Sequence, residues 1–173
     1  LSRDLPEGES VPFRAGGYIQ IEGPPHVADY HDFDVEEEYR PTWDAFKVWD
    51  NKSVCEEDVT RAYSMANYPE EEGMIMLNVR IATPPLHGPP DVPPGRVSSY
   101  VFSLKPGDRV RLSGPFGEFH IMASDPELVF IGVGAGLAPM RPLLLDLLET
   151  RLSSPSVSFW SGARNLPVLG ALV

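Results

Sequence analysis

The stretch Gly132-Val133-Gly134-Ala135-Gly136-Leu137-Ala138-Pro139 is the most informative part of this 173-residue chain. The apolar run of residues 128–131 precedes it directly, and such a run is typical of a strand that a parallel sheet buries on both faces. Residues 139–152 predict a helix, because proline is tolerated in the first turn and leucines recur at helical spacing. Residues 157–160 would form the next strand of a βαβ unit.

The glycines of this turn suit the binding of a dinucleotide. They let the backbone approach a pyrophosphate, whose charge is then stabilised by free N–H groups and by the positive end of the helix dipole. The third glycine follows the second sooner than in the usual dinucleotide fingerprint, so a turn without a ligand stays an alternative. The candidate contacts are Gly132, Gly134, Ala135, Gly136 and Pro139.

The chain before this unit has the character of a β-rich domain. The 19 prolines and 15 glycines of the sequence are spread along it and separate short runs of β-branched and aromatic residues. Several short strands of this kind favour a closed barrel. We therefore predict a barrel over residues 1–124 and a truncated parallel-sheet domain over residues 125–173. The runs that predict strands in the barrel are residues 18–22, 74–82, 99–104 and 109–113.

Residues 26–60 are acidic and aromatic at once. A solvated loop seldom carries several tryptophan and phenylalanine rings, so we expect an ordered excursion with a short helix near residues 43–48. Its carboxylates are interpreted as a solvated face and not as a cation site, because runs of like charge usually face water. These carboxylates are Asp32, Asp34, Glu36, Glu37 and Glu38.

The composition excludes several classes of function. The net charge of −11 repels phosphate backbones, so nucleic acid is not expected as a partner. No run reaches the roughly 20 apolar residues that span a bilayer, and we expect this chain itself to be soluble. Cys55 is the only cysteine and cannot form an internal disulfide or hold a metal cluster alone. The histidines lack metal-ligand spacing, so we assign no metal.

Two further motifs suit contacts with a phosphorylated cofactor. In Arg61-Ala62-Tyr63-Ser64, an arginine fork can bind phosphate, a ring on the same side of a strand can stack, and a hydroxyl follows. In Gly95-Arg96-Val97-Ser98-Ser99, a glycine turn precedes hydroxyls and N–H groups that suit a second phosphate contact. Both patterns are also common in ordinary strands and turns, so neither identifies a ligand by itself.

The order of the motifs is more specific than any one of them. Arg-x-Tyr-Ser comes first, then Asn78-Val79-Arg80 in a predicted strand, Gly-x-x-Ser, Gly114-Pro115-Phe116-Gly117 and the glycine-rich turn. In this order the chain resembles the ferredoxin:NADP reductase superfamily. More narrowly, it resembles the family of F subunits of the sodium-translocating NADH:quinone oxidoreductases. The matching stretches are residues 13–22, 61–70, 77–85 and 113–119.

The resemblance implies an antiparallel Greek-key barrel that binds FAD, followed by the start of a domain that binds NADH. Arg61 would hold the FAD pyrophosphate, Tyr63 would stack on the isoalloxazine, and Ser64 would approach its reactive nitrogen. Tyr63 and Ser64 are therefore the expected catalytic residues. Ser98 would make a second pyrophosphate contact in a segment that includes Gly95 and Val97.

Two more sets of contacts follow from the same resemblance. Asn78, Val79 and Arg80 would touch the pyrimidine edge of the flavin, largely through backbone groups. The glycine-rich turn would face NADH. Arg164, at the end of the second strand of the nucleotide domain, could meet the extra phosphate of NADPH, so residue chemistry leaves NADPH open while the resemblance favours NADH.

The implied activity is hydride transfer from NADH to FAD, which feeds electrons toward ubiquinone in a sodium-translocating respiratory complex. The other subunits of that complex would be the partners, and the parent protein would lie at the cytoplasmic face of the bacterial inner membrane. The family also has a membrane helix, an iron–sulfur domain and further βα units, which these residues do not show. We therefore expect a fragment or an incomplete gene product that retains FAD affinity, turns over NADH weakly and has a loose or associating second part.

Two alternatives stay open at this point. The first is a soluble NAD(P)H-dependent flavin reductase or the reductase component of a monooxygenase. The second is a non-catalytic remnant that binds a nucleotide, or a partner protein through the acidic excursion. FAD uptake and NADH oxidation by the purified chain distinguish the second alternative from the first.

Overall fold

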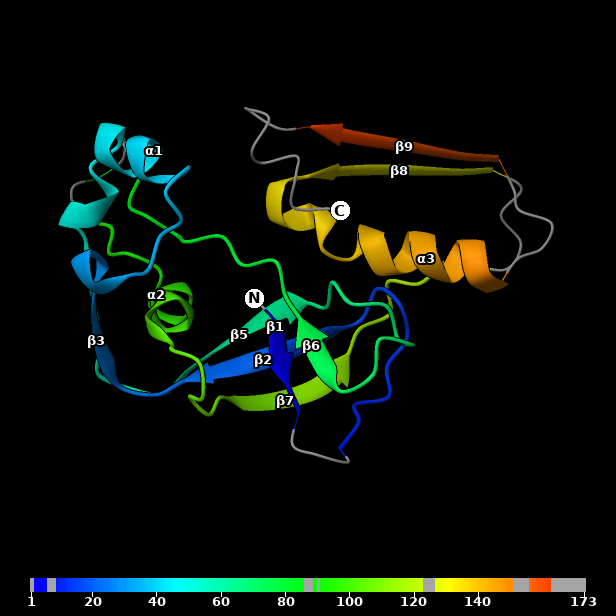
Figure 1. Cartoon of the computed structure of the whole chain (residues 1–173), viewed down its shortest axis with the longest axis horizontal. Coiled ribbons are helices and arrows are strands. Elements are labelled where there is room, and N and C mark those ends of the chain that lie inside the picture. The colour runs from blue at the N-terminus through cyan, green and yellow to red at the C-terminus, as the bar shows by residue number, and fades with distance from the viewer. Residues whose placement is uncertain are drawn as a thin grey trace. The chain divides into compact units, whose positions relative to one another are not determined.

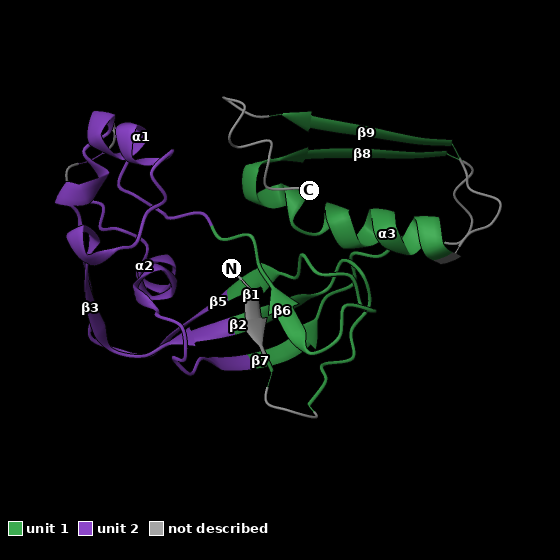
Figure 2. Ribbon diagram, viewed as in Figure 1, with its two compact units in different colours: residues 1–20, 62–79, 113–173 green, residues 21–61, 80–112 purple. Residues whose placement is uncertain are grey.

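The computed structural model describes residues 2–5, 9–85, 89, 91–122, 127–150 and 156–162. Its elements run from β1 (Ser2–Asp4) to β9 (Ser156–Gly162) (Figure 1). They belong to two compact units (Figure 2). Unit 1 comprises residues 1–20, 62–79 and 113–173, and unit 2 comprises residues 21–61 and 80–112.

A three-stranded sheet has the order β5-β2-β7, with β2 at Tyr18–Gly23, β5 at Val59–Ser64 and β7 at Arg111–Phe116. Along β2, every second side chain is buried, including Ile19 and Ile21. This period of two follows from the pleat of a strand, whose successive side chains point to opposite faces. The strands predicted over residues 18–22 and 109–113 are confirmed, the second with a shift toward Phe116.

Unit 1 contains the predicted βαβ arrangement. Strand β8 (Glu127–Val133) leads through a 3-10 turn, η3 (Gly134–Leu137), into helix α3 (Met140–Thr150), and β9 pairs with β8 in parallel. The helix packs on one face of the sheet, where Phe130 and Leu143 are buried with Ala15. Burial of a side chain such as Leu143 contributes roughly 2–3 kcal/mol. The residues after Thr150 that were predicted to continue this helix lie outside the described residues.

The other face of the β8–β9 sheet is exposed. Val129, Ile131 and Val133 alternate with the buried side of β8 and are 57%, 70% and 66% exposed. Trp160 stands opposite Ile131 in the parallel register and is 67% exposed. We define these four side chains as the bare face. The sequence predicted a strand that is buried on both faces, whereas β8 is buried on one face only.

Strands β1 and β6 (Met74–Met76) form a separate antiparallel pair in unit 1. Elsewhere in unit 1, Gly16 has a φ of +90° and packs so tightly that an added Cβ would lie 1.8 Å from the carbonyl oxygen of Phe119. Only glycine fits this position, because other residues would meet both backbone strain and a backbone clash.

Unit 2 is built around the aromatic side chains of the predicted excursion. Strand β3 (His26–Asp29) pairs antiparallel with β4 (Lys52–Cys55), and η1 (Tyr30–Asp32), α1 (Arg40–Ala45) and η2 (Val48–Asp50) lie between them in the chain. Tyr30, Phe33 and Trp43 are buried together, with the Tyr30 and Phe33 ring centroids 4.6 Å apart. The excursion is therefore ordered, and the short helix predicted there is present from Arg40 to Ala45.

The strand predicted over residues 99–104 is wrong. Arg96–Ser103 forms helix α2, and Gly95 stands at its N-cap with extended backbone angles. Val97 and Val101 are both buried, four positions apart on one face of the helix, and Phe102 packs against the aromatic cluster. These tertiary contacts override the strand preference of the valine and aromatic residues, which is weak and depends on context.

The strand predicted over residues 74–82 is too long. Strand β6 is confined to Met74–Met76, and these three residues pair with β1. One isolated bridge joins Leu77 to Met65, and residues 78–82 have no regular structure. Their apolar side chains are accommodated in another way, since Ile81 packs against the aromatic cluster of unit 2.

A closed cylinder is also not formed by the strands of the described residues. Their pairings give the three-stranded sheet, two antiparallel pairs and the parallel β8–β9 pair. Prolines at positions 84, 85, 93 and 94 lie in the segment between β6 and α2, and proline cannot donate a ladder hydrogen bond. Among the helices of the described part, none has the length and apolar character that a membrane span requires.

Candidate functional site

Strand β5 carries the first predicted motif. Arg61 is exposed, and its Nη1 donates a hydrogen bond of 2.8 Å to the carbonyl oxygen of Thr60. Tyr63 and Ser64 are half-buried at the end of the strand. There the N–H of Met65 donates to the carbonyl oxygen of Gly17 at 3.1 Å, which fixes the end of β5.

Unit 2 brings Arg61 together with the second motif. A cavity of about 550 Å³ is lined by residues 57–61 of the β5 segment and by residues 93–96 at the start of α2. Arg61 and Gly95 both line it, although 34 positions separate them in the sequence. The walls carry two arginines and two carboxylates. Arg96 Nη1 donates to Glu57 Oε1 at 2.9 Å, and this contact raises the pKa of the Arg96 guanidinium.

The start of α2 has the properties of an anion-binding helix end. The first N–H groups of a helix have no intrahelical partners, and the helix dipole makes this end positive. Gly95 must be small here, because an added Cβ would lie 2.7 Å from both Ala82 Cβ and Ser98 Oγ. The glycine therefore sets a close approach of the segment at Ala82 to the first turn of α2.

Ser98 and Ser99 use their hydroxyls inside the protein. Ser98 Oγ donates to the Gly95 carbonyl at 3.1 Å and accepts from the Ala82 N–H at 3.2 Å. Ser99 Oγ donates to the same carbonyl at 2.6 Å and lies 2.8 Å from Tyr30 Oη, whose pKa is raised by burial. The buried Ser98 side chain thus holds the helix start in place, and its own backbone N–H is the group suited to a phosphate.

Unit 1 brings a second pair of predicted segments together. The antiparallel bridge between Met65 and Leu77, with a 2.7 Å hydrogen bond from the Ala66 N–H to the Met76 carbonyl, sets the register. The bridge therefore joins the residues that directly follow Ser64 and precede Asn78. Asn78 and Val79 are half-buried, whereas Arg80 is exposed and belongs to unit 2.

The glycine-rich turn lies at the end of β8. Gly132 is buried, and an added Cβ would lie 2.6 Å from Leu137 Cδ2. Gly134 has a φ of +56°, which favours glycine, and begins the 3-10 turn η3. Ala135 and Gly136 are exposed, whereas Pro139 is buried directly before α3. Arg164, the predicted contact with the ribose phosphate, lies outside the described residues.

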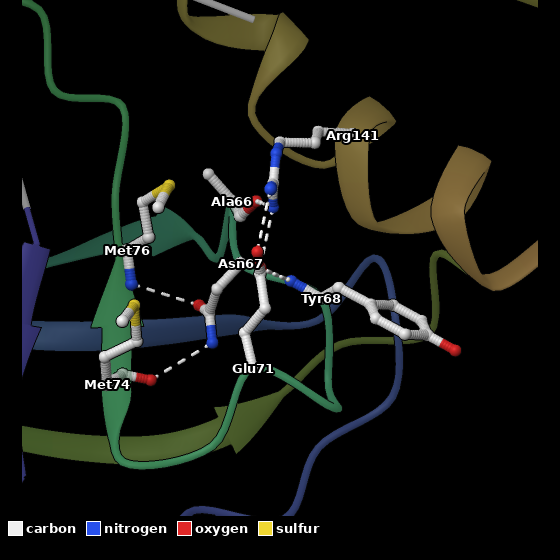
Figure 3. A network of polar contacts seen from close by, with 7 residues as sticks. All are labelled: Ala66, Asn67, Tyr68, Glu71, Met74, Met76 and Arg141. Carbon is white, nitrogen blue, oxygen red and sulfur yellow. Dashed lines mark hydrogen bonds and ion pairs between the residues drawn. The ribbon is translucent and has the colours of Figure 1, made fainter. Parts of the chain in front are cut away.

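A polar network in unit 1 was missed by the sequence analysis (Figure 3). Arg141 Nη1 donates to Glu71 Oε2 at 2.7 Å and Nη2 donates to Oε1 at 2.8 Å, which makes the pair bidentate. The contact lowers the pKa of the Glu71 carboxyl and raises the pKa of the Arg141 guanidinium. Seventy positions separate the partners, so no local pattern pointed to the pair.

Known proteins resemble the chain at two levels. The family described as "Oxidoreductase FAD-binding domain" matches residues 47–121, which include the cavity of unit 2. The F subunit of the Na(+)-translocating NADH-quinone reductase of Mannheimia succiniciproducens is 61% identical over 95% of this chain and 40% of its own length. Its counterpart in Neisseria meningitidis serogroup C is 60% identical over the same shares.

By sequence, the chain is similar to these F subunits over nearly all of its own length. It spans about two fifths of the length of these relatives, as the 40% coverage shows. The family resemblance predicted from the order of the motifs is thereby confirmed. It also explains why all the motifs, which are weak singly, occur in one order over nearly the whole chain.

Solved structures confirm the predicted fold class. The cytochrome b5 reductase domain of Ulva prolifera nitrate reductase superposes with a TM-score of 0.59 at 20% identity, over 99% of this chain and 60% of that chain. The ferredoxin-NADP+ reductase of Plasmodium falciparum gives a TM-score of 0.55 at 15% identity, over 98% and 62%. The superpositions agree with the predicted fold class, whereas the strands of the described residues do not close into a barrel.

Proposed function

We propose that this chain binds FAD and NADH and passes a hydride from NADH to FAD, as part of the F subunit of a sodium-translocating NADH-quinone reductase. The observation that carries the proposal is the cavity of unit 2, where Arg61 and the N-terminal turn of α2 line one space of about 550 Å³. Residues 1–124 would be the FAD-binding part and residues 125–173 the truncated NADH-binding part.

The residues of this cavity fit the pyrophosphate of FAD. The guanidinium of Arg61 is a bidentate donor, and the start of α2 adds backbone N–H groups and the positive end of a helix dipole. Because Gly95 has no Cβ, this backbone can lie close to Ala82, where a larger residue would clash. Glu57 and Asp58 oppose an anion, but Glu57 is already paired with Arg96, which reduces its repulsion.

The half-buried residues Tyr63 and Ser64 lie where β5 ends, and the bridge between Met65 and Leu77 joins the residues next to Ser64 and Asn78. We propose that Tyr63 stacks on the flavin ring, Ser64 donates near its reactive nitrogen, and residues 78–80 contact its pyrimidine edge. The flavin supplies the hydride-accepting chemistry when it is bound. The protein fixes the distance and angle between the two cofactors and the polarity around them.

The exposed residues Ala135 and Gly136 in η3 would face the nicotinamide nucleotide, with Gly132, Gly134 and Pro139 shaping the turn. Arg164 is proposed to lie near the adenosine ribose. The names of the relatives support electron transfer toward quinone and assembly with other subunits of a sodium-translocating complex. A place for the parent protein at the cytoplasmic face of the bacterial inner membrane is part of the same proposal.

FAD uptake tests the proposal directly. Purified chain is mixed with excess FAD, desalted, and examined for the absorbance of bound flavin, and FMN serves as the ligand that lacks the adenosine half. We expect FAD to be retained and Arg61→Ala to weaken its binding by at least about tenfold, because a charge-assisted contact is lost. Arg109→Ala removes an equal charge from an exposed position outside the cavity and should leave the affinity unchanged.

NADH oxidation with ferricyanide as acceptor tests the second half of the proposal. Slow oxidation that requires FAD supports it, and oxidation that requires no flavin contradicts it. A chain that takes up no FAD at all contradicts the whole proposal and favours a non-catalytic remnant. Oxidation of NADPH as fast as NADH would favour instead a soluble NAD(P)H-dependent reductase.

A further inference from the structure

The polar network of Figure 3 connects two elements that the proposed function assigns to different cofactors. Arg141 is the second residue of α3 and follows Pro139, the last residue of the glycine-rich turn, by two positions. Glu71 belongs to the loop between β5 and β6. The bidentate contact therefore links the helix behind the nicotinamide-facing turn to the segment behind the flavin-facing strand.

The loop side of this link is itself rigid. Glu71 Oε2 accepts the N–H of Tyr68 at 2.6 Å, and Arg141 Nη1 also donates to the Ala66 carbonyl at 3.2 Å. Asn67 is fully buried, where its Nδ2 donates to the Met74 carbonyl and its Oδ1 accepts the Met76 N–H, at 3.1 and 3.0 Å. The loop is thus fixed to β6 as well as to α3.

The contact between Arg141 and Glu71 is more buried and has more hydrogen bonds than an ordinary surface ion pair. The side chains of Arg141 and Glu71 are only 27% and 34% exposed, and both oxygens of the carboxylate are used. The guanidinium also satisfies a backbone carbonyl that directly follows the β5 segment, two residues after Ser64. A planar fork with these three contacts fixes orientation as well as distance, which a lysine in its place would not do.

We propose that Arg141 and Glu71 are positioning residues that hold the glycine-rich turn at a fixed distance from the end of β5, so that nicotinamide and flavin meet in register. Neither residue touches a cofactor in this proposal. Hydride transfer depends steeply on distance and alignment, so loosening the pair slows the transfer while leaving the affinity for each cofactor nearly unchanged. The proposal rests on the proposed function, because it presupposes that both cofactors bind.

The test uses the FAD-loaded 173-residue chain and anaerobic stopped-flow reduction by NADH. Glu71→Gln and Arg141→Lys should each lower the limiting rate of flavin reduction by about tenfold. The Kd for FAD and the NADH concentration at half-maximal rate should change by less than about twofold. Glu70→Gln, at the exposed neighbouring carboxylate, is the matched control and should leave the rate unchanged.

A charge exchange distinguishes positioning from simple damage to the fold. The double variant Glu71→Arg with Arg141→Glu restores the ion pair in the opposite direction and should recover part of the lost rate. Circular dichroism of each variant confirms that the fold is retained. A merely structural role would move the limiting rate, the FAD affinity and the helical signal together, and that result would overturn the proposal.

Two other results are decisive. If the unaltered chain is reduced by NADH and Glu71→Gln is reduced at the same rate, the positioning role is wrong while the proposed function stands. If the unaltered chain binds FAD but is not reduced by NADH, the hydride-transfer function is wrong, and the positioning role fails with it.

Discussion

Helices α2 and α3 both follow a segment that contains glycine, yet only α3 was predicted from the sequence. In α3, a buried strand, a glycine-rich turn, a proline and a leucine face follow one another along the chain. In α2, Gly95 at the N-cap is the only local signal for the start of a helix, and the helix contains valine and aromatic residues that favour strands. The comparison shows that a helix can be predicted from the sequence when its pattern is local. It cannot be predicted in this way when side chains that are distant in the sequence stabilise it.

The largest loss of stability should come from a change in the aromatic side chains that pack against α2. Trp43→Ala removes a buried ring that lies between Tyr30 and Phe102, with centroid distances of 6.2 and 6.3 Å. We expect the free energy of unfolding to fall by about 3–5 kcal/mol, because a large cavity is left behind. Urea denaturation followed by circular dichroism measures this. Phe46→Ala, at a 51% exposed ring in the same segment, should change it by less than about 0.5 kcal/mol.

The next effect concerns the start of α2. Gly95→Ala should cost about 1–3 kcal/mol, because the new methyl group meets Ala82 Cβ and Ser98 Oγ at 2.7 Å and overpacks the site. The same shift should weaken FAD binding, which a fluorescence titration detects. Gly136→Ala is the control, since a Cβ there meets nothing within 4 Å. Equal effects of the two substitutions would show that the close approach at Gly95 is unimportant.

A smaller, pH-dependent effect is expected at the start of α3. The Arg141 contact lowers the pKa of the Glu71 carboxyl. A lowered folded-state pKa means that the pair stabilises fully above the ordinary carboxyl range and that this stability is lost as the pH falls through the folded-state pKa. After discounting for its one-third exposure, Glu71→Gln should cost about 1 kcal/mol at pH 7. Urea denaturation should show the difference from the unaltered chain shrinking in acid, and a constant difference would contradict this origin.

The smallest effect belongs to the glycine-rich turn itself. Gly134→Ala places a methyl group in open space, but the φ of +56° disfavours any residue with a Cβ. The strain of the left-handed region is partly offset by the lower entropy of the unfolded chain, so we expect a loss of about 0.5–1 kcal/mol. Thermal unfolding would report it. A loss as large as that of Gly95→Ala would remove the distinction between steric and backbone constraints.

Much of the fold could be predicted from the sequence, because the patterns that indicate its elements are local. The alternation along β2 and the sequence from β8 to α3 each indicate one structure within a short window. Strand β6 was predicted too long, and helix α2 was predicted as a strand. Ile81, beyond β6, and Phe102, in α2, both pack against buried residues between Ala28 and Val48, which are distant in the sequence. Contacts between distant segments leave no local period to detect.

The candidate site divides in the same way. Arg61, Ser98 and the glycines were found because their residue types and order suggest a phosphorylated cofactor. That Arg61 and Gly95 line one cavity is a product of folding and could only be seen in the structure. The hydrogen bonds of the Ser98 hydroxyl within the protein and the bidentate contact of Arg141 with Glu71 likewise became visible only in the structure.

The bare face of β8 and β9 has a practical consequence for anyone who handles this chain. Val129, Ile131, Val133 and Trp160 present apolar area to water in the native state, so a fluorescent dye such as ANS should bind without any denaturant. Sulfate and phosphate strengthen apolar association, so ammonium sulfate should precipitate the protein early. The net charge of −11 acts in the opposite sense, and dilute buffers near neutral pH should therefore keep the chain in solution longest.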